Sequence, residues 1–130
     1  MLRERKLQAM SAVWRVASHA LFFTDWDLSA MQTDWAPAPP FSSRDEAAYV
    51  VPPAYTRAEL LGYIDQCRRK VDELFSNLTD DQAAMPLPET HRYREWSFGQ
   101  LLLGGVSHLQ RHSAEVRTFL RTQNLRCADE

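Results

Sequence analysis

The stretch that decides the fold is residues 97–122, SFGQLLLGGVSHLQRHSAEVRTFLRT. Ser97 is followed three residues later by Gln100, the pattern of a capping box, which marks the start of a helix. Apolar residues and histidines then recur at three- and four-residue steps, which places them on one helical face. These positions are Leu101, His108, His112, Val116 and Phe119. We therefore predict a helix from Ser97 to about Thr122.

Two adjacent glycines interrupt this predicted helix. Gly104 and Gly105 each cost roughly 1 kcal/mol relative to alanine in a helix interior. Such a cost is tolerable where another helix or a ligand comes close to the backbone. The pair therefore predicts a close approach at this point of the helix.

Two further segments show helical periodicity. The segment from about Arg5 to Ala30 contains no Gly or Pro, and its apolar positions lie on one face: Ala12, Val16, Phe22, Phe23 and Trp26. The second helix begins at a capping box of Thr56 and Glu59. Its apolar stripe runs to about Leu78 and comprises Leu60, Leu61, Ile64, Cys67, Val71, Leu74, Phe75 and Leu78. One further short turn is predicted from Thr79 to Gln82, and no strand pattern is present, so the fold class is an all-α, up-and-down helical bundle.

Irregular segments connect these helices. Residues 31–55 hold five of the seven prolines, which disfavour a regular helix. Trp35, Phe41, Tyr49 and Val51 lie within it, so we interpret it as an ordered strap or lid that packs on the bundle. A second irregular stretch runs from Pro86 to Trp96, and the tail from about Asn124 is expected to be frayed.

Length and composition set the broad class. The chain has 130 residues, 45% of them hydrophobic and 25% charged, which fits one globular domain over residues 1–130. The net charge of −2 and the pI near 6.1 give no sign of nucleic-acid or membrane binding. No apolar run is long enough to cross a bilayer. Since neither a signal peptide nor a membrane span is seen, we expect a cytoplasmic protein.

Arginine and cysteine usage have simple interpretations. Thirteen arginines against two lysines suit recognition of carboxylates and phosphates, but a coding bias explains them as well. Cys67 and Cys127 are interpreted as free thiols in a reducing compartment. Because Cys67 lies within an apolar stripe, a small buried side chain is favoured over a reactive thiol.

Histidine placement is the most informative feature of the chain. His108 and His112 are four residues apart, so both imidazoles project from the same helical face and can reach one metal ion. His19 lies on the aromatic face of the first predicted helix and is the candidate third ligand. Three neutral imidazoles favour Zn, Ni, Cu or Fe and leave a coordination position open for water or substrate. The alternative is that these histidines are core residues that are hydrogen-bonded internally.

Other polar groups give weaker indications. Asp25 and Asp27 are two residues apart on a helix and should point in different directions. Glu115 either orients His112, acts as a general base, or is an ordinary solvated residue. His91 is expected at the surface, within a small cationic cluster over residues 91–94. The chain has no phosphate-binding loop, nucleophile elbow or dithiol motif, which removes those chemistries from consideration.

The segments AVWRVASHALFFTDW, residues 12–26, and SFGQLLL followed by VSHLQRH, residues 97–112, resemble the DinB-like (DinB/YfiT) superfamily of metal-binding helical bundles. The similarity spans about residues 10–122. It implies that His19, His108 and His112 bind a divalent metal, with zinc or nickel as the ion. Characterised relatives include thiol-dependent S-transferases and a mycothiol-dependent isomerase, so the resemblance implies chemistry on a low-molecular-weight thiol.

The chain departs from the family pattern in one respect. Members have a further helix ahead of the one that carries the first histidine, and here only about eight residues precede that helix. A smaller bundle would leave an apolar face open, so we expect a homodimer in which a second copy covers it. The two functional hypotheses are therefore a metal-dependent thiol transferase or isomerase and, alternatively, a non-catalytic, dimerising bundle that binds a metal or ligand. The sequence assigns no catalytic residue beyond the three predicted ligands.

Overall fold

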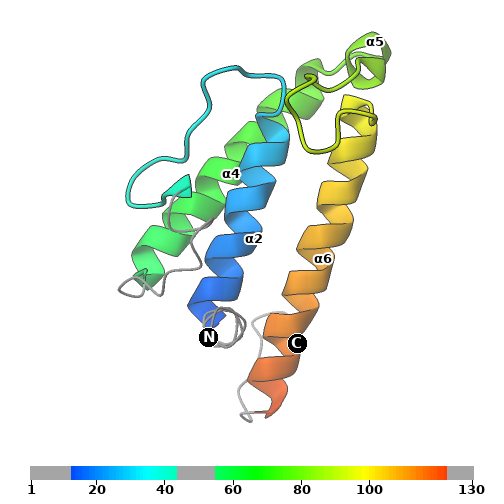
Figure 1. Cartoon of the computed structure of the whole chain (residues 1–130). Helices are drawn as coiled ribbons and strands as arrows, with labels where there is room; N and C mark the ends of the chain where they lie inside the picture. Colours follow the sequence, from blue (N-terminus) through cyan, green and yellow to red (C-terminus); the bar gives the residue numbers. More distant parts are fainter. Residues whose placement is uncertain (1–12, 44–54, 123–130) are drawn as a thin grey trace.

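Four helices make up the part of the chain that the computed structural model describes, residues 13–43 and 55–122. They are α2 (Val13–Leu28), α4 (Arg57–Asn77), α5 (Asp80–Ala84) and α6 (Phe98–Thr122). Figure 1 shows the three long helices side by side, and α2 packs against both α4 and α6. Within these described ranges the only β feature is an isolated bridge between Pro86 and Ser97. The predicted all-α bundle is confirmed.

Several predictions concern residues outside these ranges. They concern the start of the first helix near Arg5, the absence of a helix ahead of it, and the packing of Tyr49 and Val51 in the Pro-rich segment. They also concern the frayed tail and the free thiol of Cys127. They stay predictions. Among the described helices, none is both long and apolar enough to span a membrane.

Capping boxes start three of the helices where the sequence predicted them. At α4, the Thr56 hydroxyl accepts from the Glu59 N–H at 3.1 Å, and the Glu59 carboxylate accepts from the Thr56 N–H at 2.9 Å. Ser97 and Gln100 make the same reciprocal pair at α6, and so do Thr79 and Gln82 at α5. Each box satisfies two backbone donors that a helix end otherwise leaves unpaired.

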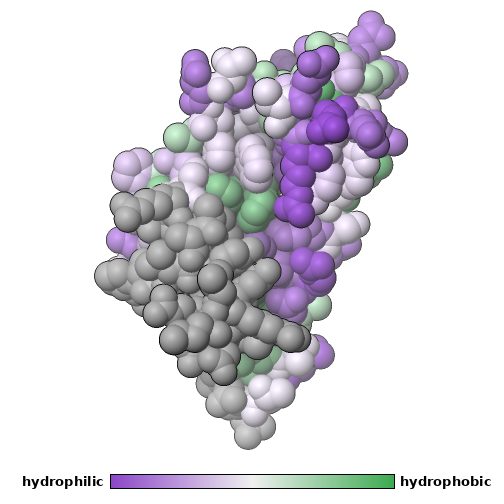
Figure 2. Space-filling model, in the orientation of Figure 1, coloured by the Kyte–Doolittle hydropathy of each residue, from purple (hydrophilic) through white to green (hydrophobic). Residues whose placement is uncertain are grey.

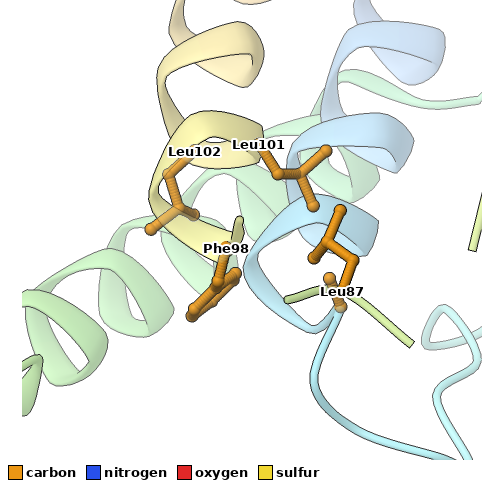
Figure 3. Close-up of a cluster of buried hydrophobic side chains, with 5 residues drawn as sticks. Leu87, Phe98, Leu101 and Leu102 are labelled. Carbon is orange, nitrogen blue, oxygen red and sulfur yellow. The ribbon is translucent and has the colours of Figure 1, made fainter. Parts of the chain in front are cut away.

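One apolar cluster closes the end of the bundle where α6 begins (Figure 3). It consists of Ala30, Leu87, Phe98, Leu101 and Leu102, all buried. The loop between α5 and α6 contributes Leu87, whose N–H donates to the Trp96 carbonyl, while the Phe98 N–H donates to the Met85 carbonyl. These two bonds close the base of the loop, so the second irregular stretch is an ordered connection that packs on the core.

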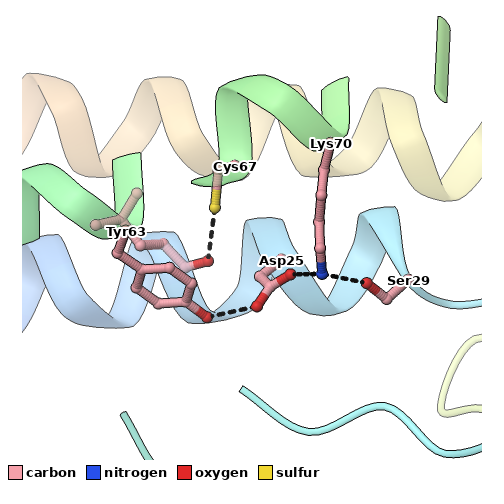
Figure 4. A network of polar contacts seen from close by, with 6 residues as sticks. Asp25, Ser29, Tyr63, Cys67 and Lys70 are labelled. Atoms are coloured by element: carbon pink, nitrogen blue, oxygen red, sulfur yellow. Dashed lines mark hydrogen bonds and ion pairs between the residues drawn. The ribbon is translucent and has the colours of Figure 1, made fainter. Parts of the chain in front are cut away.

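A polar network joins α2 to α4 (Figure 4). Asp25 is fully buried; the Tyr63 hydroxyl donates to it at 2.8 Å and the Lys70 ammonium also donates to it. Lys70 donates to Ser29 as well, at 3.0 Å. A buried carboxylate is tolerated when it is paired and hydrogen-bonded in this way. The neighbouring Cys67 is a buried free thiol, as predicted, and burial raises its pKa to about 12.

The predicted apolar stripe of α4 is only partly buried. Cys67 is buried, but Leu61, Val71 and Phe75 are exposed, with Phe75 at 54%. Tyr63, which lay outside the predicted stripe, is the most buried side chain of the helix at 1%. The apolar stripe therefore coincides only in part with the buried side of α4, which packs on α2 and, through Leu74, on the cluster at the start of α6.

The two glycines of α6 mark the close approach that the sequence predicted. A side chain at Gly104 would meet the ring of Trp96 at 3.0 Å, and one at Gly105 would meet a carboxylate oxygen of Asp27 at 2.8 Å. The pair therefore forms a notch in α6 that admits one side chain from the preceding loop and one from α2. We call it the glycine notch.

Candidate metal centre

The three predicted histidines meet between α2 and α6. His19 comes from the middle of α2, and His108 and His112 come from successive turns of α6. One ring nitrogen from each lies within 4.8 Å of the others. His112 is buried at 4% exposure, and the other two are half-buried. The helix packing thus brings together residues from both ends of the chain, as a shared ligand set requires.

The α6 pair has the geometry of two ligands to one ion. The Nε2 atoms of His108 and His112 are 3.0 Å apart. Zinc–nitrogen bonds of about 2.0–2.1 Å in a tetrahedral arrangement place ligand nitrogens about 3.3 Å from one another. A small adjustment therefore suffices for both nitrogens to bind one ion. The residues present fit a divalent metal.

Glu115 sets the hydrogen-bonding state of His112. A carboxylate oxygen of Glu115 lies 2.9 Å from Nδ1 of His112. Because a carboxylate only accepts, Nδ1 carries the proton, and Nε2 of the neutral ring keeps its lone pair. That nitrogen is the one that faces His108. Of the roles left open for Glu115, orientation of the imidazole is the one its contact performs, although its side chain is half-exposed.

One aromatic ring of α2 packs against two of the three histidines. Phe23, one turn beyond His19, lies 4.8 Å from the His19 ring and 5.6 Å from the His108 ring, measured between centroids. Burial, reinforced by the neighbouring imidazoles, lowers the pKa of His108 to about 4. His108 is therefore neutral at physiological pH, the form that binds a metal.

His91 is not the surface residue that the sequence predicted. Its ring contacts Trp26 of α2 at 5.8 Å, and its Nε2 atom is shielded from solvent. Burial lowers the pKa of His91. The prediction failed because the loop between α5 and α6 folds back onto α2. No local sequence pattern predicts this contact. The adjoining Arg92 and Arg94 are exposed, and hydrophilic side chains gather over this end of the face shown in Figure 2.

Asp27 lies near the candidate site, and the sequence pattern did not identify it as a functional candidate. As expected, it points away from Asp25: Asp25 faces α4, and Asp27 faces Gly105 of α6. Burial raises the pKa of the Asp27 carboxyl from 3.8 to about 7. The available signal was its spacing, because His19, Phe23 and Asp27 follow one another at four-residue steps on one face of α2.

The chemistry available here follows from the ligand type and number. Three neutral imidazoles make a site for a borderline divalent ion and leave room for a further ligand. Structural zinc sites are closed by four protein ligands, whereas catalytic sites keep one position open. Within the described residues, this histidine triad is the only group of metal-ligating side chains, and three ligands would leave a position open on an ion held there.

Comparison with known proteins agrees with these observations. The family model of the DinB superfamily matches residues 6–116, a range that contains all three histidines. No curated protein and no solved structure matches the chain. The resemblance seen in the two histidine-bearing segments is confirmed: this chain belongs to the DinB superfamily.

Proposed function

We propose that this protein is a metal-dependent enzyme that acts on a small molecule and holds one divalent ion with His19, His108 and His112. The observation that carries the proposal is the convergence of three ring nitrogens, from two helices, within 4.8 Å of one another. Zinc or nickel is the proposed ion, since both accept neutral imidazoles and the family resemblance implies them.

His19, His108 and His112 would hold the ion, which would supply Lewis acidity toward a water or a thiol. The protein's own residues do the remaining work. Glu115 holds the imidazole of His112 in one orientation, and Phe23 shields the histidines on the α2 side. Shielding keeps the local dielectric low, which strengthens every electrostatic interaction at the site.

The proposed reaction is a thiol-linked transfer or isomerisation on a low-molecular-weight thiol. The support is the family resemblance together with an open coordination position. An open hollow of about 530 Å³ lies along α6 and is lined in part by Glu115, the partner of His112. The hollow is open to solvent and is lined only by residues of α6, so it offers a small molecule a surface beside the centre rather than an enclosed pocket.

The first experiment is elemental analysis of tag-free protein. The proposal predicts about one equivalent of zinc or nickel per chain, lost in His108→Ala with helical content preserved. His91→Ala is the matched control, because His91 is a histidine of the described chain that lies outside the triad, and this variant should keep its metal. Full metal content in His108→Ala would refute the ligand assignment.

A non-catalytic bundle is the alternative that the same histidines allow. A cobalt-substituted protein separates the two, because an exchangeable position changes its visible spectrum when a thiol binds. The enzyme proposal predicts a saturable spectral change with at least one member of a panel of small thiols. An unchanged spectrum across the panel would favour the non-catalytic bundle.

We also propose that the protein is a homodimer. Large apolar side chains are exposed along α6, with Leu103 at 72%, Val106 at 53% and Leu109 at 41%. They follow at three-residue steps and so share a face of the helix. Apolar side chains gathered on one face indicate an interface, and a second copy offers the same face for a two-fold contact.

Sedimentation at micromolar protein tests the dimer. The wild-type protein should sediment as a dimer, and the double variant Leu103→Glu with Val106→Glu as a folded monomer. Arg94→Glu, which changes an exposed charge on the loop between α5 and α6, serves as the control and should leave the dimer intact. A wild-type protein that sediments as a monomer would reject the proposal.

A further inference from the structure

Asp27 is a carboxylate that the described fold does not pair. No hydrogen bond or ion pair to it forms within residues 13–43 and 55–122, and burial alone is what shifts its pKa. Asp25 shows how the same helix treats a structural carboxylate, since Tyr63 and Lys70 both donate to it. A poorly solvated acid without a partner is costly and is more typical of functional sites than of scaffolds.

The glycine notch is built around this carboxylate. Any side chain at Gly105 would press against Asp27 at 2.8 Å, and any at Gly104 would press against Trp96 at 3.0 Å. Glycine is unfavourable in the interior of a helix, yet both of these positions are occupied by glycine. The notch therefore admits an acid and an indole ring at adjacent positions of α6.

Aromatic rings and two further unpaired polar atoms lie at the same end of α2 as Asp27. The Trp26 ring contacts Trp35, stacked at 6.4 Å, and His91 at 5.8 Å. The indole nitrogen of Trp35 and Nε2 of His91 are shielded from solvent and have no hydrogen-bond partner. Tyr93 stacks on Trp96 at 4.7 Å. One end of the α2–α6 seam thus combines an unpaired acid, unpaired polar nitrogens and indole faces.

We propose that Asp27 anchors a protonated amine of the small-molecule substrate, whose other end reaches the three-histidine centre. An ammonium group supplies both the missing positive charge and the missing N–H donors. Indole faces attract the same cation through their negative π-surfaces. An anionic group would meet repulsion from the carboxylate, and an apolar group would leave it unpaired.

The placement of Asp27 suits a ligand that spans two subsites. On α6, Gly105 precedes His108 by three residues, about 4.5 Å along the helix axis, and on α2 Asp27 follows His19 by about 12 Å. Phe23 lies between the two levels on α2 and contacts both histidine rings. A fully extended three-carbon aminothiol, with a metal–sulfur bond at one end and an N–H···O hydrogen bond at the other, reaches about 10 Å, a length between these two separations. This inference names a substrate class and rests on the proposed function for the sulfur end.

Three small thiols of similar size test the proposal on zinc-loaded protein by calorimetry. Aminopropanethiol carries an ammonium group, butanethiol has a methyl in its place, and mercaptopropionate carries the opposite charge. Aminopropanethiol should bind at least about tenfold more tightly than butanethiol, as a charge-assisted hydrogen bond provides. Mercaptopropionate should bind most weakly of the three.

Asp27→Asn should remove the preference for the amine and leave the affinity for butanethiol unchanged. Asp34→Asn is the matched control, because Asp34 is an exposed aspartate just beyond the same helix, and it should behave as wild type. A preference for the amine that survives in Asp27→Asn would overturn the proposal. An equal loss of affinity for all three thiols would overturn it too, and would indicate a proton acceptor.

Phenylethylamine, which has no sulfur, separates this inference from the proposed function. Its binding to metal-free protein is followed by tryptophan fluorescence, since three indoles lie at this end of the seam. Saturable binding that Asp27→Asn abolishes supports the amine site even if no thiol binds the loaded protein. Thiol binding without any amine effect in either experiment supports the proposed function and rejects the amine site.

Discussion

At the residue scale, the contact between Glu115 and His112 is the clearest link between sequence spacing and chemistry. The two residues are three apart on α6, so the carboxylate lies over the next turn, 2.9 Å from Nδ1. Half of the Glu115 side chain is exposed, so the contact contributes little to folding stability by itself. Its effect is on the imidazole: it keeps Nε2 free to bind a metal.

Glu115→Ala should lower metal affinity by about 10- to 100-fold, because His112 then loses the partner that orients it. Competition with a chelator of known affinity measures the change. Glu115→Gln keeps an accepting oxygen and should lose less. Glu73→Ala is the control, since Glu73 is an exposed glutamate of α4 far from the histidines in the chain. Equal affinity in all three variants would show that Glu115 is an ordinary solvated residue.

Asp27 makes stability depend on pH in a direction opposite to that of a salt-bridged acid. Burial raises its pKa from 3.8 to about 7, so the folded state disfavours the charged form. The penalty is absent below the unfolded pKa of 3.8, grows as pH rises through this interval, and is complete above about 7.

Asp27→Asn should therefore stabilise the fold at alkaline pH, by about 2 kcal/mol once partial solvent access is allowed for. Urea unfolding at about pH 8 and about pH 4 measures the difference, which should shrink to a small fraction at the lower pH. If Asp27 is a functional acid, Asp27→Asn should gain folding stability and at the same time lose amine binding, because functional residues are often not the most stable choice at their position. A variant that is less stable at both pH values would contradict the assigned burial penalty.

At the element scale, the glycines of the chain divide into those that accommodate a neighbour and those that do not. Gly62 in α4 has nothing within 4 Å of an added Cβ, whereas Gly105 would meet Asp27 at 2.8 Å. Gly62→Ala should stabilise the protein by about 1 kcal/mol, the helix propensity difference. Gly105→Ala should fail to show this gain, because the Asp27 side chain must move.

A double-mutant cycle isolates the reason. When Asp27 is already alanine, Gly105→Ala should recover a gain of about 1 kcal/mol, since the carboxylate no longer occupies the notch. Chemical denaturation of the four proteins gives the coupling. Additive effects within about 0.3 kcal/mol would mean that Asp27 and Gly105 do not press on each other.

At the scale of the whole molecule, the histidine triad connects α2 to α6, which share the most extensive contact among the described helices. An ion bound only by the folded state stabilises it by mass action, by about 2.7 kcal/mol when free metal is one hundred times its dissociation constant. Removal of metal with a chelator should therefore lower Tm. The same treatment of His108→Ala should leave Tm unchanged, and an identical shift in both proteins would exclude the triad as the source.

The sequence by itself determined the local features of this protein. Capping boxes, helix ends and the pairing of His108 with His112 depend on backbone geometry over three or four residues, and that geometry is the same in every α-helix. Gly104 and Gly105 likewise predicted that another group comes close to α6. The sequence did not identify that group. The family resemblance rests on these same short segments and is confirmed over residues 6–116.

Only the tertiary structure decided which faces meet. It brought His19 to the α6 pair, turned His91 onto Trp26, placed Asp27 in the glycine notch, and left Phe75 exposed. Each of these outcomes depends on how helices and a loop that are far apart in the chain pack together. Because hydrophobic burial is non-directional, periodicity identifies an apolar face but does not identify the element that covers it. Local spacing thus predicted two of the three histidine positions as neighbours, and packing determined everything that surrounds them.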